Sequence, residues 1–156
     1  MAAPNSQSSE LGLAAALAAG IGRQNVALFV NLANLTNAIT VGFVPGFKGR
    51  LISYSFVALL PSSTASKDAT LTAKVETTAM TGGVLALLTA GTNAAGETTD
   101  ATAITALNAF SATQALNFTI AVSAVFIEGN GWLLLRIIND DTIEALANAL
   151  GGYRTP

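Results

Sequence analysis

Apolar residues recur at every second position in several short stretches of the chain, and this alternation predicts β-strands with one buried face. The clearest example is 69–76, whose apolar set is Ala69, Leu71, Ala73 and Val75. A second stretch, 115–122, carries the set Leu116, Phe118, Ile120 and Val122. Both stretches therefore predict strands that turn these side chains toward a common core.

Further strands are predicted from runs of β-branched and aromatic residues at 26–30, 39–43, 84–89 and 124–127. In the stretch 50–60, we expect a single face formed by Ile52, Tyr54, Phe56, Ala58 and Leu60. The run 132–138 is apolar at nearly every position, which predicts a central strand covered on both faces. Gly, Pro and Asn separate the strands, and Thr81-Gly82-Gly83 is expected to be a turn.

Seven or eight short strands at regular spacing predict an all-β fold, an antiparallel β-sandwich of jelly-roll type. We expect three parts: an N-terminal arm at 1–23, the sandwich at 24–140 and a C-terminal tail at 141–156. The segment 90–113 is rich in Gly, Ala and Thr and is longer than an ordinary hairpin loop, which predicts that it is functional or packs on a neighbouring subunit. Within it, a weak strand or a helical turn is expected around 103–109.

Both terminal segments contain helix signals. In the arm, Ser9 is a candidate cap for a helix over 10–19 that ends at Gly20, and an extended apolar arm is the alternative. In the tail, Asp141 and Glu144 have the spacing of a capping box, which predicts a short helix to Leu150.

Chemically reactive side chains are scarce in this chain. The 156 residues include no histidine and no cysteine, and 10% are charged whereas 51% are hydrophobic. Histidine is the usual proton-transfer group near neutral pH, and cysteine is required for disulfides and thiolate metal sites. The composition therefore favours a structural or binding role over an enzyme. Because the chain carries too little charge for repulsion to keep monomers apart, we expect other subunits to cover part of the apolar surface.

Charge and hydropathy also exclude two classes of partner. The net charge is −2 and the seven Lys and Arg residues are scattered, so no basic patch for nucleic acid is predicted. The apolar stretch 11–21 follows Glu10, lacks a basic flank and is about half the ~20 residues that span a bilayer. We therefore expect neither a nucleic-acid nor a membrane partner, and no export signal.

The candidate sites for chemistry are few. Two acidic groups, Glu97 with Asp100 and Asp140 with Asp141 and Glu144, lack the pattern of a calcium loop, so a solvated loop and a helix cap are favoured over metal binding. The aromatic residues of a possible carbohydrate-stacking platform are Phe43, Phe47, Tyr54, Phe56 and Trp132, although core packing is the commoner use of aromatics at strand spacing. No catalytic residue, metal or cofactor is expected.

Residues 49–88 carry three motifs: Gly49-Arg50-Leu51, Ala69-Thr70-Leu71-Thr72-Ala73-Lys74 and Thr81-Gly82-Gly83. Their order resembles the strand, loop, strand and turn of small β-sandwich proteins that decorate, or cement, the capsids of tailed bacteriophages. The resemblance spans roughly 40–140. It implies trimers at local three-fold positions of an icosahedral head, where they bridge neighbouring major capsid proteins, and it brings no catalytic residue.

The resemblance and the composition together predict a structural virion protein on the capsid surface, synthesised in the host cytoplasm. Its expected partners are the major capsid protein and further copies of itself in a homotrimer. The candidate interface residues are Leu11, Leu13, Leu17, Ile21 and Phe29. One alternative is a receptor- or glycan-binding module of a phage head or tail fibre. Another is a carboxylate-based hydrolase that uses Asp100 with Asp140 or Asp141.

Overall fold

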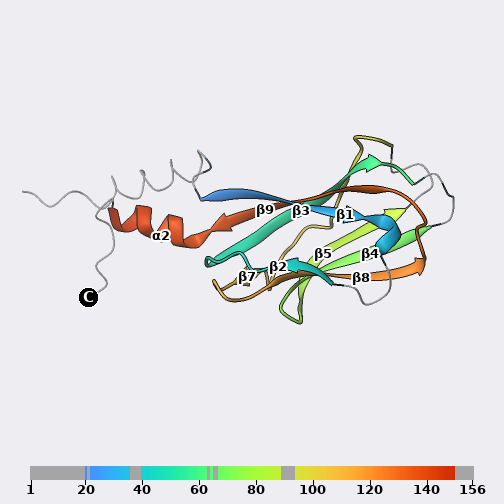
Figure 1. The fold of residues 1–156 in the computed structure, drawn as a ribbon. Helices are drawn as coiled ribbons and strands as arrows, with labels where there is room; N and C mark the ends of the chain where they lie inside the picture. The colour runs from blue at the N-terminus through green and yellow to red at the C-terminus, as the bar shows by residue number, and fades with distance from the viewer. Residues whose placement is uncertain are drawn as a thin grey trace, which may run out of the picture.

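The computed structural model describes residues 20, 22–35, 40–62, 64, 67–88 and 94–149. Two antiparallel sheets pack face to face, and one helix projects from an end of the sandwich (Figure 1). The elements are β1 (Arg23–Asn31), the 3₁₀-helix η1 (Leu32–Asn34), β2 (Thr40–Phe43), β3 (Gly49–Leu60), β4 (Asp68–Val75), β5 (Thr78–Leu88), β6 (Thr98–Asp100), β7 (Ala109–Phe110), β8 (Leu116–Ala124), β9 (Asn130–Asn139) and α2 (Asp140–Ala149). The predicted all-β sandwich with a short C-terminal helix is confirmed.

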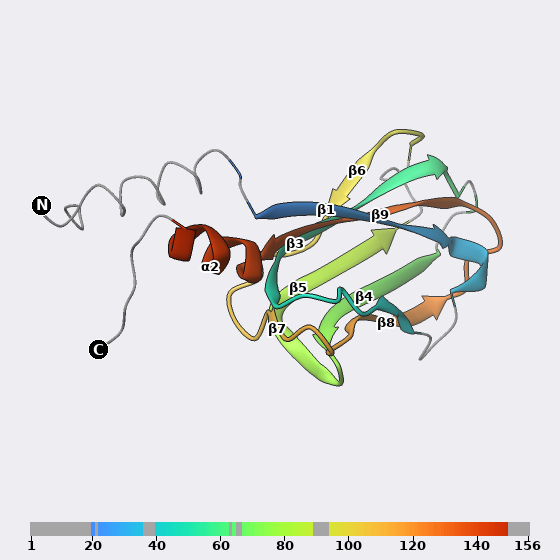
Figure 2. The same cartoon turned by 60° about the vertical axis from the view of Figure 1, so that its left-hand side comes forward.

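The strand order is that of a jelly roll. Sheet A has the order β1-β9-β3-β6, with the short β7 also paired to β3, and sheet B has the order β2-β8-β4-β5. With β7 set aside, the antiparallel pairs are nested: β4 with β5, β3 with β6, β2 with β8 and β1 with β9. This nesting is what results when one long hairpin is rolled into two facing sheets, and Figure 2 shows the two layers.

The core lies between the sheets and contains the alternating residues predicted from the sequence. Both predicted sets, on β4 and on β8, are at most 8% exposed. Sheet A contributes Leu133, Leu135 and Ile137 of β9 from the opposite side. Burial of these apolar surfaces is the main force that holds the two sheets together.

Tyr54 places one polar group inside this core. Its hydroxyl lies 2.9 Å from the carbonyl oxygens of both Leu71 and Gly83, which share its single proton. Its ring packs edge-on against Phe118, with 4.9 Å between the ring centroids. Because burial disfavours the phenolate, the pKa of Tyr54 is raised above its ordinary value. The hydroxyl thus links β3 to sheet B.

The expected single face of β3 is wrong at both ends. Tyr54, Phe56 and Ala58 are buried, but Ile52 is 41% and Leu60 54% exposed. The register of β3 against β9 shifts between Leu51 and Ser53 and again between Ala58 and Leu60. Each shift is a bulge in which an extra residue reverses the side to which the following side chains point. The bulges therefore turn Ile52 and Leu60 to the outside.

The predicted turn at Thr81-Gly82-Gly83 is also wrong, because β5 continues through these residues. The β4–β5 hairpin turns earlier, at residues 76–77. Gly82 and Gly83 have φ values of +78° and +62°, and a Cβ on Gly82 would overlap the carbonyl oxygen of Ala103. Glycine is required here because another segment crosses the strand closely.

That crossing segment belongs to the stretch 90–113, of which residues 94–113 are described. After β6, the Ala101 N–H donates to the Tyr54 carbonyl of sheet A, and the Thr102 N–H donates to the Val84 carbonyl of sheet B, at 3.0 and 2.8 Å. Residues 101–106 thus run from one sheet to the other and close an edge of the sandwich. The part described is mostly extended chain that is hydrogen-bonded to both sheets.

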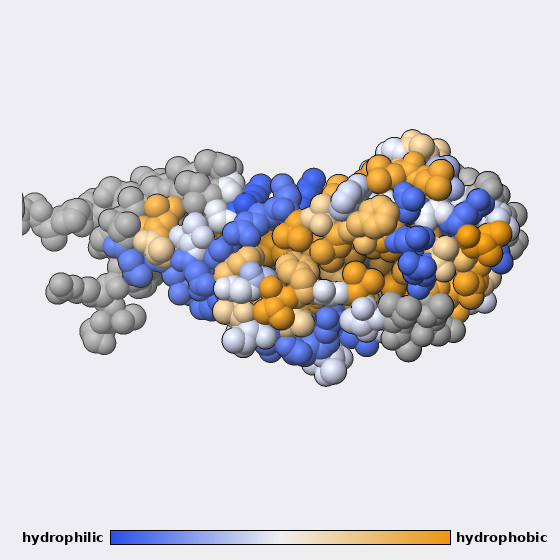
Figure 3. Space-filling model, in the orientation of Figure 1, coloured by the Kyte–Doolittle hydropathy of each residue, from blue (hydrophilic) through white to orange (hydrophobic). Residues whose placement is uncertain are grey.

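The opposite edge is formed by β1 and β2. Val26 and Leu28 of β1 and Val41 and Phe43 of β2 pack against the core but are only partly buried. Figure 3 shows this side of the molecule, where hydrophobic residues cover a broad area and hydrophilic residues gather near α2. Among the described residues, no helix is both long and apolar enough to cross a membrane.

Candidate functional site

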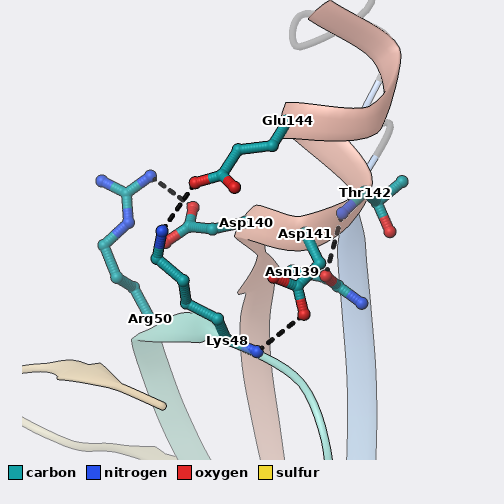
Figure 4. A network of polar contacts seen from close by, with 7 residues as sticks. All are labelled: Lys48, Arg50, Asn139, Asp140, Asp141, Thr142 and Glu144. Carbon is teal, nitrogen blue, oxygen red and sulfur yellow. Dashed lines mark hydrogen bonds and ion pairs between the residues drawn. The ribbon is translucent and has the colours of Figure 1, made fainter. Parts of the chain in front are cut away.

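A network of charged side chains joins α2 to the beginning of β3 (Figure 4). The Lys48 ammonium lies 2.6 Å from the Glu144 carboxylate, and the Arg50 guanidinium lies 2.9 Å from that of Asp140. The backbone N–H of Lys48 donates to Asp141. The hydrogen bond from Lys48 to Glu144 and the charge of that carboxylate raise the pKa of Lys48. The carboxylates of this group therefore hold the helix against the β2–β3 connection.

The helix cap differs from the predicted capping box. The helix begins at Asp140, and the side-chain oxygen of Asn139 accepts a hydrogen bond from the Thr142 N–H at 3.1 Å. Asn139 therefore acts as the N-cap in place of Asp141, two residues earlier than predicted. Since Asp140 and Asp141 fall in the first turn, their negative charges lie next to the positive end of the helix dipole.

The other candidate carboxylates are not brought together. Glu97 accepts a hydrogen bond from the Ala94 N–H at 2.8 Å, whereas Asp100 is exposed on β6 opposite Ser55. Asp140 pairs with Arg50, whereas Asp100 lies opposite Ser55. These two β3 residues are five positions apart, so their Cα atoms are separated by roughly 16 Å. Two carboxylates of a glycosidase lie at most about 9.5 Å apart. The described residues also contain no group of three side chains placed to hold a metal ion.

The aromatic residues proposed as one platform lie in different places. Tyr54 and Phe56 are in the core, and Phe47 packs against Phe110 with 5.9 Å between centroids. Trp132 lies on the outside of sheet A, where it meets Phe29 edge-on at 5.4 Å. These two side chains are 37% and 53% exposed, respectively. This pair was not predicted from the sequence, because its members are far apart in the chain and meet through the β1–β9 register.

We call the outward side of sheet A the sheet A face. The residues of this face lie in rows that run across the strands. One row contains Phe29, Trp132 and Val57; the next contains Ala27, Leu134, Ser55 and Asp100; the third contains Asn25, Arg136 and Ser53. The second and third rows line a hollow of about 640 Å³. A neighbouring hollow of about 550 Å³ shares Asn25, Ser53 and Arg136 with it. The face thus consists of an aromatic ridge beside a depression.

The two sheets have unlike outer faces. In the described part of the chain, ten large apolar residues are exposed. Four of them lie on the outer face of sheet A, namely Phe29, Ile52, Trp132 and Leu134, and Leu59 and Leu60 lie at the end of β3. None of the ten lies on a strand of sheet B. The outward positions of β4 and β8 in sheet B are Thr70, Thr72, Lys74, Asn117, Thr119, Ala121 and Ser123. Sheet B therefore presents small and polar side chains to the solvent.

A second apolar surface lies at the end of the sandwich away from α2, where β3 and β8 end (Figure 1). We call it the loop end, and it consists of Leu59, Leu60, Val125 and Ile127, which are 49–66% exposed. The predicted strand at 124–127 is not formed beyond Ala124, where β8 ends. Phe126 is instead buried in the core at 1% exposure, while its two neighbours are exposed.

Of the five predicted interface residues, the structure describes Phe29, and it lies on the sheet A face. Leu11, Leu13, Leu17 and Ile21 lie outside the described residues, as does the predicted helix over 10–19. No protein-family model, curated protein or solved structure matches the chain. What the arrangement offers is apolar surface for burial against other molecules, on the sheet A face and at the loop end.

Proposed function

We propose that this chain is a structural protein of a virus particle: a decoration protein that forms homotrimers on the head of a tailed bacteriophage, bridges major capsid proteins and stabilises the shell. The observation that carries the proposal is the unequal distribution of exposed apolar residues, which are concentrated on one sheet and one end of the sandwich. A free monomer gains nothing from such surfaces, whereas a subunit of a lattice buries them.

Two further observations support this role. The motifs in 49–88 that resemble capsid decoration proteins form β3, β4 and part of β5, which lie within the sandwich. The whole chain carries little charge and no histidine or cysteine, which suits burial between repeated subunits better than catalysis. On this proposal, the loop end rests on the capsid and the Thr-rich sheet B faces the solvent.

The size of the loop end suits binding in several copies. Complete burial of a Val, Leu or Ile side chain contributes about 1.5–3 kcal/mol, and the four residues are about half exposed. Their burial therefore contributes about 1 kcal/mol each, or about 4 kcal/mol per copy, before the cost of association. One copy would bind weakly. Three linked copies would bind far more tightly, because the second and third contacts form intramolecularly.

The test uses particles of the phage that encodes the chain. We expect mass spectrometry to find the chain in purified heads, and we expect added protein to rebind heads from which it has been removed. The double variant Val125→Asp/Ile127→Asp should bind heads at least tenfold more weakly. The matched control, Ala112→Asp/Thr113→Asp, places the same charges in an exposed turn at the other end and should bind normally. Absence of the chain from heads, or equal binding by both variants, would refute the proposal.

The exposed Phe29–Trp132 pair favours a second candidate, a receptor- or glycan-binding module of a phage head or tail fibre. Aromatic faces beside a hollow lined by serine, asparagine and arginine are suited to stacking on a sugar ring and hydrogen bonding to its hydroxyls. In that case, Trp132→Ala would abolish adsorption to host cells and leave head stability unchanged. A decoration protein would show the opposite pattern.

A further inference from the structure

We infer that copies of this chain associate with one another through the sheet A face. This inference rests on the proposed function, because it assigns a surface to the self-association that the decoration role includes. It concerns the free protein, however, and can be tested without any particle. The partner is a second copy of the chain, for three reasons that concern area, shape and charge.

The sheet A face has about the area that a stable contact between subunits needs. The strands β1, β9, β3 and β6 contain 9, 10, 12 and 3 residues, respectively. At roughly 3.4 Å per residue and roughly 4.8 Å per strand, the projected face is about 550 Å², which is of the same order as the ~800 Å² that each partner buries in an interface of standard size. Its centre is apolar, with Phe29, Trp132 and Leu134 all at least 37% exposed. Aromatic residues at the centre are typical of protein interfaces.

The shape of the face is complementary to itself. Phe29 and Trp132 form a ridge at one outward position, and the next outward positions, Ala27 and Leu134, begin the hollow of about 640 Å³. A second copy that lies on this face in the appropriate orientation places its own ridge in this hollow. The contact then buries the ridge of one copy in the depression of the other.

The charges of the face are complementary in the same sense. Arg136 of β9 and Asp100 of β6 both line the hollow and are both exposed. Neither is in an ion pair with any residue that the structure describes. The hollow carries one cation and one anion at different positions, so it attracts another copy of itself: Arg136 of one copy can meet Asp100 of the next. Such a head-to-tail contact can close into a ring, as the proposed trimer requires. A partner of uniform charge would satisfy only one of the two.

Light scattering coupled to gel filtration measures the association directly. We expect the full chain at about 10 μM to have a mass that is a multiple of the monomer mass. Trp132→Thr should shift it toward the monomer, with at least a tenfold weaker association. Val44→Thr is the matched control, because Val44 is 54% exposed but lies in the β2–β3 connection away from the face, and its mass should not change.

A charge exchange tests the pairing itself. Arg136→Glu and Asp100→Arg should each weaken association at least tenfold, and the double variant should restore it because the two charges have changed places. Lys74→Glu, a reversal on sheet B, should have no effect. Circular dichroism verifies that each variant is folded; if one of the reversals unfolds, Arg136→Gln and Asp100→Asn replace it, and both should weaken association.

Several results would overturn the inference. A wild-type monomer at 100 μM would show that the face is covered by something other than a second copy, such as the capsid or a glycan. An oligomer that is insensitive to Trp132→Thr and to both charge variants would place the contact elsewhere, as would a double reversal that restores nothing. An oligomer that responds as expected but does not bind heads would refute the decoration role and leave this inference standing.

Discussion

Replacement of Gly82 by alanine puts a methyl group at the point where residues 101–106 cross β5. The backbone of Gly82 has a φ of +78°, and its Cβ would overlap the carbonyl oxygen of Ala103. The overlapping atom belongs to the backbone, so no side-chain rotation can relieve it. The crossing segment must move, and with it the hydrogen bonds that close this edge of the sandwich.

The magnitude follows from two contributions. A left-handed backbone conformation costs an alanine about 1–2 kcal/mol. Movement of the segment breaks the hydrogen bond from the Gly83 N–H to Thr102 and the one from the Thr102 N–H to Val84, now 3.1 and 2.8 Å long. Each contributes about 1 kcal/mol. Gly82→Ala is therefore expected to lower the free energy of unfolding by about 3–4 kcal/mol.

Gly46→Ala provides the control for backbone strain alone. Gly46 has a φ of +81°, but nothing lies within 4 Å of the position of its Cβ. Its substitution should cost only the conformational contribution of about 1–2 kcal/mol. Urea unfolding followed by Trp132 fluorescence gives both values, and the expected difference between the variants is about 2 kcal/mol. Equal costs for Gly82→Ala and Gly46→Ala would refute the close crossing as the reason for glycine at position 82.

Two further predictions concern polar groups in the sandwich and its helix. Burial raises the pKa of Tyr54, so the folded chain keeps this proton at pH values where the unfolded chain loses it. The free energy of unfolding should therefore fall above pH ~10, by up to ~1.4 kcal/mol per pH unit. Urea unfolding from pH 7 to 11 measures this fall, and Tyr54→Phe should remove the part that Tyr54 causes. An equal alkaline slope in both proteins would contradict it. Asn139→Ala should destabilise α2 by about 1 kcal/mol and speed amide exchange in its first turn, with exchange in β4 unchanged.

The alternation in the sequence predicted well which residues of β4 and β8 form the core. It failed where the register departs from a simple ladder. At Ile52 and Leu60, bulges that depend on the pairing of β3 with β9 reverse the expected side. At Gly82, the glycine resembles a turn residue, but it is required because a segment about twenty residues later in the chain crosses the strand closely. In both cases the cause is a contact between distant parts of the chain, which a local pattern does not contain.

The candidate site shows the same division. The apolar character of 132–138 on both sides was evident from the sequence and predicted a central strand, and β9 is central in sheet A. However, none of the described core residues covers the outer side of β9, where Trp132 and Leu134 are exposed. The excess of apolar residues was therefore visible in the sequence, while its position on the surface was not.

The sequence by itself determined the fold class, the inward residues of the regular strands and the shortage of groups for chemistry, because these depend on residue type and on the period of two between side chains on one face. The tertiary structure alone decided the nested strand order, the meeting of Phe29 with Trp132, and the placement of Arg136 and Asp100 on one face. The reason is that strand pairing is non-local: many registers satisfy the same alternation, and packing of the whole core selects among them.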